Sequence, residues 1–136
     1  MNDPIFIDTN CFNDLSFIKW LKDYHGRKSI SVITYAELLY HFVYNKGKKK
    51  EILNRILNNS QIKIVNLRSI EVDESVGFLK LCKGSIPWKE NFNDYLIAGH
   101  IHNRPTKLIT QNRKDFSYLH DDCVVDMYEF MKRKKR

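Results

Sequence analysis

The chain has 136 residues, of which 43% are hydrophobic and 12% aromatic, and its formal net charge is +7. This length and composition predict one compact domain with a hydrophobic core, and they exclude a chain that is disordered throughout. No apolar run approaches the roughly 18–20 residues of a membrane span, and no secretory leader opens the sequence. We therefore expect a cytoplasmic protein that does not enter a membrane.

Most of the excess positive charge lies at the C-terminus. Residues 132–136 are all basic, and without them the chain has 18 basic against 16 acidic residues. We expect residues 1–131 to form the domain and residues 132–136 to form a basic tail. A second cluster comprises Lys46 and the three lysines at 48–50. Such runs attract polyanions, but they are also typical of solvated ends and turns, so charge alone does not establish RNA binding.

The cysteine and histidine spacings argue against zinc and against a disulfide framework. The residues concerned are Cys11, Cys82, Cys123, His41, His100 and His102. The cysteines are odd in number and far apart, with no C-x-x-C pair. His100 and His102 are two residues apart on a predicted helix, so they face different directions instead of sharing a metal. We expect these histidines at the surface.

In the first half of the chain, apolar periodicity predicts two strand–helix units. Residues 4–7 form a short apolar strand that stops at Asp8, and helical spacing follows up to Leu21. Residues 29–33 predict a second strand. Thr34 and Glu37 then match the T-x-x-E capping box of a helix that covers residues 35–43. Gly47 separates this helix from another over residues 48–59.

The second half continues the alternation. Residues 62–67, 107–110 and 123–125 predict strands, and residues 69–82 and 91–103 predict helices. Alternating strands and helices are typical of a parallel sheet. The sequence therefore predicts an α/β fold with a central, mostly parallel twisted sheet of about five short strands and helices on both faces.

Polar side chains gather where the predicted strands end. Asp8 follows the first strand, Glu37 lies in the helix after the second, and Thr110, Asn112 and Asp115 follow the fourth. Ligands of open α/β sheets bind beyond the carboxyl ends of the strands. We therefore expect these side chains to share one edge of the sheet.

Asp94 lies on the apolar stripe of its predicted helix. The stripe comprises Asp94, Ile97, Ala98 and Ile101, at positions i, i+3, i+4 and i+7. An unpaired buried carboxylate is costly, so Asp94 requires a cation, a basic side chain or a cluster of donors. The basic candidates are Arg104 and Arg113.

Several carboxylates at one sheet edge would repel one another unless a hard cation lay among them. Mg²⁺ and Mn²⁺ prefer carboxylate oxygens, retain water and activate it toward phosphodiesters. On this hypothesis Asp8, Glu37 and Asp94 hold the metal, and Asp115 or Asn112 orients a water molecule or a second ion. Each residue also has a structural alternative: Asp8 as a helix N-cap, Glu37 in the capping box, Asp94 in an ion pair and Asp115 as a loop acid.

Four segments in register resemble the PIN-domain nucleases, and within them the VapC-type toxin ribonucleases. They are residues 6–10 (FIDTN), 34–38 (TYAEL), 93–98 (NDYLIA) and 108–116 (LITQNRKDF). The resemblance spans about residues 5–116 and implies a PIN-like fold. It assigns metal binding to Asp8, Glu37 and Asp94. Many relatives have an acid where this chain has Asn112; others have Asn there and an acid at the position of Asp115, which we favour as the fourth site residue.

The resemblance further implies an Mg²⁺- or Mn²⁺-dependent endoribonuclease that cleaves RNA, forms a homodimer and is the toxin of a type II toxin–antitoxin pair with an antitoxin partner. Support or substrate contacts would come from Thr9, Asn10, Thr110, Asn112 and Arg113. Two alternatives stay open: a housekeeping PIN nuclease in RNA maturation, and a non-catalytic RNA-binding module. Tyr40 and Tyr44 share a helix face with Glu37, so they either stack on a substrate base or serve a core or interface.

Overall fold

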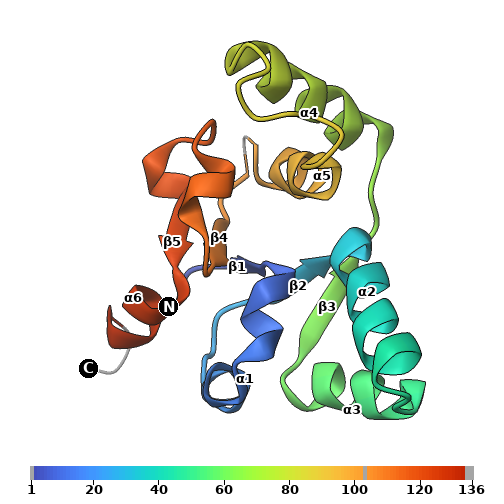
Figure 1. Ribbon diagram of the computed structural model, residues 1–136. Helices are drawn as coiled ribbons and strands as arrows, with labels where there is room; N and C mark the ends of the chain where they lie inside the picture. Colours follow the sequence, from blue (N-terminus) through green and yellow to red (C-terminus); the bar gives the residue numbers. More distant parts are fainter. Residues whose placement is uncertain (1, 103, 134–136) are drawn as a thin grey trace.

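The computed structural model describes residues 2–102 and 104–133, which build one five-stranded sheet (Figure 1). Its strands are β1 (Ile5–Ile7), β2 (Lys28–Ser31), β3 (Ile62–Val65), β4 (Lys107–Thr110) and β5 (Val124–Asp126). The order across the sheet is β3-β2-β1-β4-β5, and every neighbouring pair is parallel. The predicted α/β class is therefore confirmed.

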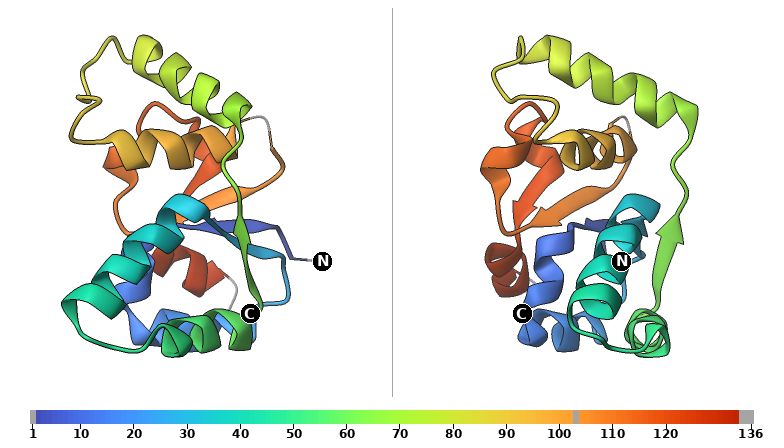
Figure 2. Two further views of the ribbon diagram at one scale, coloured as in Figure 1. Left: turned by 90° about the vertical axis from the view of Figure 1, so that its right-hand side faces the viewer. Right: turned by 45° about the vertical axis from the view of Figure 1, so that its right-hand side comes forward.

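Helices cover both faces of the sheet (Figures 1 and 2). The α-helices are α1 (Leu15–Leu21), α2 (Val32–Leu39), α3 (Lys50–Asn59), α4 (Ser69–Leu81), α5 (Phe92–Ile101) and α6 (Met127–Arg133). On one face lie α1, α2, α3 and α6, whereas α5 lies on the other face with α4 stacked outside it. None of the helices in the described part of the chain is long and apolar enough to cross a membrane.

Each face of the sheet has its own hydrophobic core. Ile5 and Ile7 of β1 point into the core beneath α1, α2 and α6, where Phe17 and Leu38 are fully or almost fully buried. Phe6, between them, points into the other core and packs with α5. Side chains alternate between the two faces because a strand has a period of two residues. Burial of a strand on both faces is typical of a parallel sheet.

The register of the parallel strands places two polar positions together. Ile7 of β1 lies beside Ile109 of β4, so Asp8 and Thr110 leave the sheet at the same edge. The Asp8 amide also donates to the Ile109 carbonyl at 2.9 Å, which extends the pairing by one step. Because β1 is the central strand, the residues that follow it lie between the carboxyl ends of β2 and β4.

The second strand ends earlier than the sequence predicts. It stops at Ser31, and α2 begins at Val32 with the Ser31 hydroxyl accepting from the Ile33 amide at 3.0 Å. The expected cap, Thr34, is instead wholly buried inside the helix, and its hydroxyl has no hydrogen-bond partner among the residues that the structure describes. The predicted capping box is therefore wrong, and Glu37 is not engaged in capping α2.

Other boundaries also differ from the prediction. The helix over 35–43 is divided into α2 and a π-helix, Tyr40–Asn45 (η2), and α5 ends at Ile101, with residue 103 outside the described residues. Lys132 and Arg133, expected in a tail, are the last residues of α6. The rest of that expected tail, residues 134–136, lies outside the described part.

Candidate active site

Four carboxylates from separate parts of the chain line one pocket of about 300 Å³ at the carboxyl edge of the sheet. They are Asp8 after β1, Glu37 in α2, Asp94 in the first turn of α5 and Asp115 in the 3-10 helix Arg113–Phe116 (η3). Thr9 and Asn10 line the same pocket. The structure thus brings together the four acids that the sequence singled out.

Asp8 is buried and held by hydrogen bonds to both carboxylate oxygens. Its Oδ1 accepts from the Thr9 amide at 2.8 Å, and its Oδ2 accepts from the Thr110 hydroxyl at 2.8 Å. The pKa of Asp8 is raised to about 6, mainly by burial; the charges of Glu37 and Asp115 add to the rise, and the two hydrogen bonds oppose it. Asp8 does cap the short 3-10 helix Thr9–Asn13 (η1). Capping alone, however, does not account for its position among three other acids.

Glu37 is bound to neighbours on two other elements. The Thr9 hydroxyl donates to its Oε1 at 2.5 Å, and the Asn93 side-chain amide donates to its Oε2 at 3.3 Å. Thr9 therefore connects the two acids, because its amide contacts Asp8 while its hydroxyl contacts Glu37. These contacts fix the direction of the Glu37 carboxylate toward the pocket.

The Asp94 carboxylate has no hydrogen bond or ion pair to any residue within 2–102 or 104–133. Arg104, one expected partner, instead binds Glu71 at 2.9 Å, and Arg113, the other, pairs with Asp121 at 3.8 Å. The ion-pair alternative for Asp94 is therefore wrong. Burial, together with the charges of Asp8, Asp115 and Glu37, raises the pKa of Asp94 to about 7.

Hydrogen bonds join the loop after β4 to the rim of the pocket. Asn112 donates from its side chain to Asp115 Oδ2 at 2.9 Å and from its backbone to the Thr110 hydroxyl at 3.1 Å. Asn10 donates to the same hydroxyl at 3.3 Å and accepts from the Gln111 amide at 3.1 Å. Asp115 lines the pocket and Asn112 does not; Asn112 instead holds the Asp115 carboxylate by a hydrogen bond.

Some pocket residues were not singled out by the sequence, and one that was lies elsewhere. Asn13, His41 and Phe42 line the pocket, as does Lys46, which was expected in a solvated turn. Arg113 lines a separate hollow with Phe116 and does not reach the carboxylates. Asn13 belongs to η1, His41 and Phe42 belong to η2, and Lys46 directly follows η2. Helical periodicity covered the first three residues, but it did not indicate which of them face the pocket.

His100 is wholly buried, contrary to the expected surface position. Its Nε2 lies 2.9 Å from the Ser31 hydroxyl, its ring stacks on Phe6, and its Nδ1 has no partner in the described residues. Burial lowers its pKa to about 4, so the ring is neutral at pH 7. His100 is a core residue. His41 and His102 are exposed, as expected.

The acids of the pocket fit a hydrated divalent cation better than a bare one. Across the described ranges, no three Asp, Glu, His or Cys side chains form a closed metal-ligand cluster. Mg²⁺ and Mn²⁺ do not require one, because they retain several water ligands and bind through one or two carboxylates. Asp94, half-buried near three acids and without a basic partner at 2–102 or 104–133, supplies the unsatisfied negative charge that such an ion would neutralise.

Comparison with known proteins gives one family and a set of structural relatives. Residues 5–120 match the PIN domain. Three similar solved structures are a toxin–antitoxin complex from Klebsiella pneumoniae, a DNA-bound VapBC from Salmonella typhimurium and a promoter-bound VapBC2 from Rickettsia felis. Their TM-scores are 0.68, 0.71 and 0.58, and their identities are 22%, 19% and 22%. They cover 91%, 93% and 90% of this chain, which in turn covers 98%, 99% and 97% of theirs. No curated protein matches by sequence.

Proposed function

Since this chain belongs to the PIN domain family, we propose that it is an Mg²⁺- or Mn²⁺-dependent endoribonuclease whose active site is the carboxylate pocket. One observation carries the proposal: Asp8, Glu37, Asp94 and Asp115 line a single pocket, and Asp94 has no basic partner among the described residues. A structural role for these acids would pair them with cations of the chain.

Asp8, Glu37 and Asp94 are proposed to hold the metal, one or two of them directly and the rest through its retained water. A divalent ion held there would supply positive charge for the phosphodiester and would lower the pKa of water. Thr110 and Thr9 keep the oxygens of Asp8 in place, and Thr9 and Asn93 do the same for Glu37. Preorganised ligands avoid reorganisation during the reaction, which is why these neutral residues matter for rate.

Asp115 and Lys46 are proposed to act at the edge of the pocket. Asp115, directed by Asn112, would orient a water molecule or a second ion. Lys46 lines the pocket and is exposed, so its ammonium group, which lies 5.2 Å from the centre of the Phe42 ring, can also reach a substrate phosphate. Phosphate contacts of this kind position a nucleic acid without reading its sequence.

We also propose that the protein is the toxin of a toxin–antitoxin pair and that it forms a homodimer. The support for the first part is the fold it shares with a toxin–antitoxin complex and two VapBC assemblies. Light scattering coupled to size exclusion measures the dimer, and co-expression with the product of an adjacent small gene tests the antitoxin. A monomer, or no inhibitory neighbour, would contradict the respective part.

The decisive experiment is cleavage of a mixed RNA pool by purified protein whose mass spectrum shows no second chain. Wild type is assayed with Mn²⁺, Mg²⁺ or EDTA beside Asp8→Asn, with Asp73→Asn on the outer face of α4 as the matched control. We expect cleavage that requires both the metal and Asp8, and an unimpaired control. RNA binding without cleavage in any metal would instead identify a non-catalytic RNA-binding module.

A further inference from the structure

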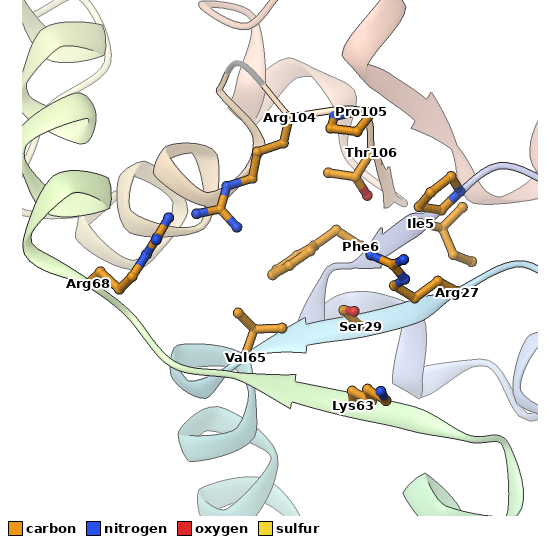
Figure 3. A pocket seen from close by; sticks show the side chains of 11 residues that line it. Ile5, Phe6, Arg27, Ser29, Lys63, Val65, Arg68, Arg104, Pro105 and Thr106 are labelled. Atoms are coloured by element: carbon orange, nitrogen blue, oxygen red, sulfur yellow. The ribbon is translucent and has the colours of Figure 1, made fainter.

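A second pocket, larger than the carboxylate pocket, lies over β1, β2 and β3 on the face of the sheet that α5 covers. It has a volume of about 560 Å³ and is formed where β1, β2 and β3 meet the segments that flank α4 and α5 (Figure 3). Its lining contains four basic side chains and no acidic one: Arg27, Lys63, Arg68 and Arg104. They come from four separate segments, so the charge clusters of the sequence do not reveal them.

Two of these arginines are held in place by a buried acid. Glu71 of α4 is 2% exposed, and its Oε2 accepts from Arg68 Nη2 at 2.8 Å and from Arg104 Nη2 at 2.9 Å. A guanidinium group has five N–H donors on three nitrogen atoms. Arg68 uses two of these nitrogens for Glu71, and Arg104 uses one. Among the described residues, each arginine therefore keeps N–H donors for a ligand while its position is fixed.

The charge of the pocket is not neutralised by the protein. Glu71 balances one of the two arginines, and Glu74 adds a weaker favourable interaction with Arg68. Arg27 and Lys63 form no ion pair with the residues at 2–102 and 104–133. Unpaired cations that converge on one hollow attract a multiply charged anion, and arginine forks match the oxygens of a phosphate.

The floor of the pocket is apolar. Figure 3 shows Phe6 at its centre and Val65 beside it, with the guanidinium groups of Arg68 and Arg104 on the helical side. Ser29 and Thr106 add hydroxyl groups to the lining. The volume greatly exceeds what one phosphate group needs and falls within the ~300–1,000 Å³ typical of small-molecule sites.

We propose that this cationic pocket, defined by Arg27, Lys63, Arg68 and Arg104 over Phe6, is a binding site for a nucleoside 5′-phosphate. The phosphate lies among the basic side chains, and the base and sugar cover the apolar floor. This chemistry is shared by a free mononucleotide and by the 5′-phosphorylated end of an RNA. The site is independent of the carboxylate pocket, because Arg104 follows the C-terminal end of α5 whereas Asp94 lies in its first turn.

The test is isothermal titration calorimetry of the full chain in EDTA with AMP, adenosine, inorganic phosphate, and an RNA hexamer carrying either a 5′-phosphate or a 5′-hydroxyl. The double variant Arg27→Gln/Lys63→Gln removes two charges that have no structural partner in the described residues. Its matched control, Lys19→Gln/Lys22→Gln, removes the same charge from exposed positions at α1. Circular dichroism checks that both variants fold.

We expect saturable binding of one AMP or one 5′-phosphorylated hexamer per chain, and much weaker binding of adenosine and the 5′-hydroxyl RNA. Arg27→Gln/Lys63→Gln should weaken the affinity by about tenfold and reduce its salt dependence, while the control retains the wild-type affinity. Preference for AMP over the hexamer identifies a free nucleotide as the ligand, and the reverse identifies an RNA end. Absence of saturable binding to both AMP and the 5′-phosphorylated hexamer, equal affinity for the two hexamers, or equal losses in both double variants would overturn the proposal. Cleavage of the RNA pool is a separate readout, so this proposal and the nuclease proposal fail independently.

Discussion

The hydroxyl of Thr110 donates a 2.8 Å hydrogen bond to Oδ2 of Asp8, although 102 residues separate them. The bond joins the carboxyl ends of two adjacent parallel strands, β1 and β4, and Asp8 is buried there beside other acids. A buried carboxylate accepts such bonds at a net gain, because they favour its ionised form. Thr110 thereby makes Asp8 available as an anion at neutral pH.

Thr110→Val removes this donor with little change in volume. Because the hydrogen bond lowers the pKa of Asp8, its loss should raise that pKa above about 6 and shift the acid side of the pH–rate profile to higher pH. Stability should fall by about 1–2 kcal/mol, since a buried acceptor is left unsatisfied. Cleavage rates and urea unfolding measured from pH 5 to 9 check both effects.

Thr34→Val is the matched control for that variant. The Thr34 hydroxyl is buried and has no partner in the described part of the chain, so the same chemical change should be neutral or stabilising by about 1 kcal/mol. Cleavage should be unchanged. Equal shifts of the pH profile in the two variants would show that Thr110 does not act through Asp8.

Asp94→Asn should reduce metal-dependent cleavage by at least about a hundredfold and leave the fold intact. The amide preserves the shape of the side chain but lacks the charge that binds a cation. Single-turnover cleavage at saturating Mn²⁺ measures the effect, and Asp73→Asn, an exposed acid of α4, is the control. Wild-type turnover by Asp94→Asn would place the metal site elsewhere.

The metal-free protein should lose stability as the pH rises. Asp94 has a pKa of about 7 in the folded chain against 3.8 ordinarily, so between about pH 4 and 7 the unfolded chain releases a proton that the folded chain retains. Stability therefore falls with pH across that window. Asp94→Asn lacks this titrating group. In EDTA, the Tm of the variant minus the Tm of wild type should therefore increase from pH 5 to pH 8. Parallel Tm curves would refute the raised pKa.

Divalent ions should reverse that loss. Mn²⁺ binds ionised carboxylates, so adding it should raise the Tm of wild type more at pH 8 than at pH 5. Asp94→Asn should show a much smaller rise at either pH. Differential scanning fluorimetry with Mn²⁺ and with Ca²⁺ measures the effect independently of any RNA substrate.

The exposed pair Tyr40 and Tyr44 should contribute to RNA affinity. Their rings stack at 5.4 Å between centroids, and their side chains are 54% and 77% exposed beside the segment that supplies His41 to the carboxylate pocket. Stacking of a base on an aromatic ring contributes about 1–3 kcal/mol. In the Asp8→Asn background, Tyr44→Ala should weaken binding of unpaired RNA by roughly fivefold or more. Tyr44→Phe keeps the ring and should bind RNA as tightly as the background variant. Fluorescence anisotropy with labelled RNA measures the affinity of both variants.

Glu71 should be important for stability, in contrast to a surface acid. Glu71→Gln weakens the contacts to Arg68 and Arg104 at a buried position and should cost about 1–3 kcal/mol. Glu129→Gln weakens an exposed pair with Arg133 on α6 and should cost less than about 0.5 kcal/mol. Urea unfolding of both variants checks the difference.

The sequence by itself determined the α/β class, the five strands and the acids at their ends. These follow from local rules: an apolar run of three or four residues followed by polar caps indicates a strand end, and parallel strands bring such ends to one edge. Asp94 was found because a carboxylate on an apolar helix stripe violates the expected pattern. The motif segments are likewise local, so the family was recognisable without coordinates.

Only the tertiary structure decided which partners these residues have. Thr34 could not be separated from Ser31 as a helix cap by pattern alone, because both hydroxyls precede apolar helical positions. Arg104 pairs with Glu71 instead of Asp94 because α4 stacks on α5 and presents Glu71 to the end of that helix. The burial of His100 and the convergence of Arg27, Lys63, Arg68 and Arg104 arise in the same way. Such contacts join residues far apart in sequence, and their energies depend on packing geometry that no local pattern records.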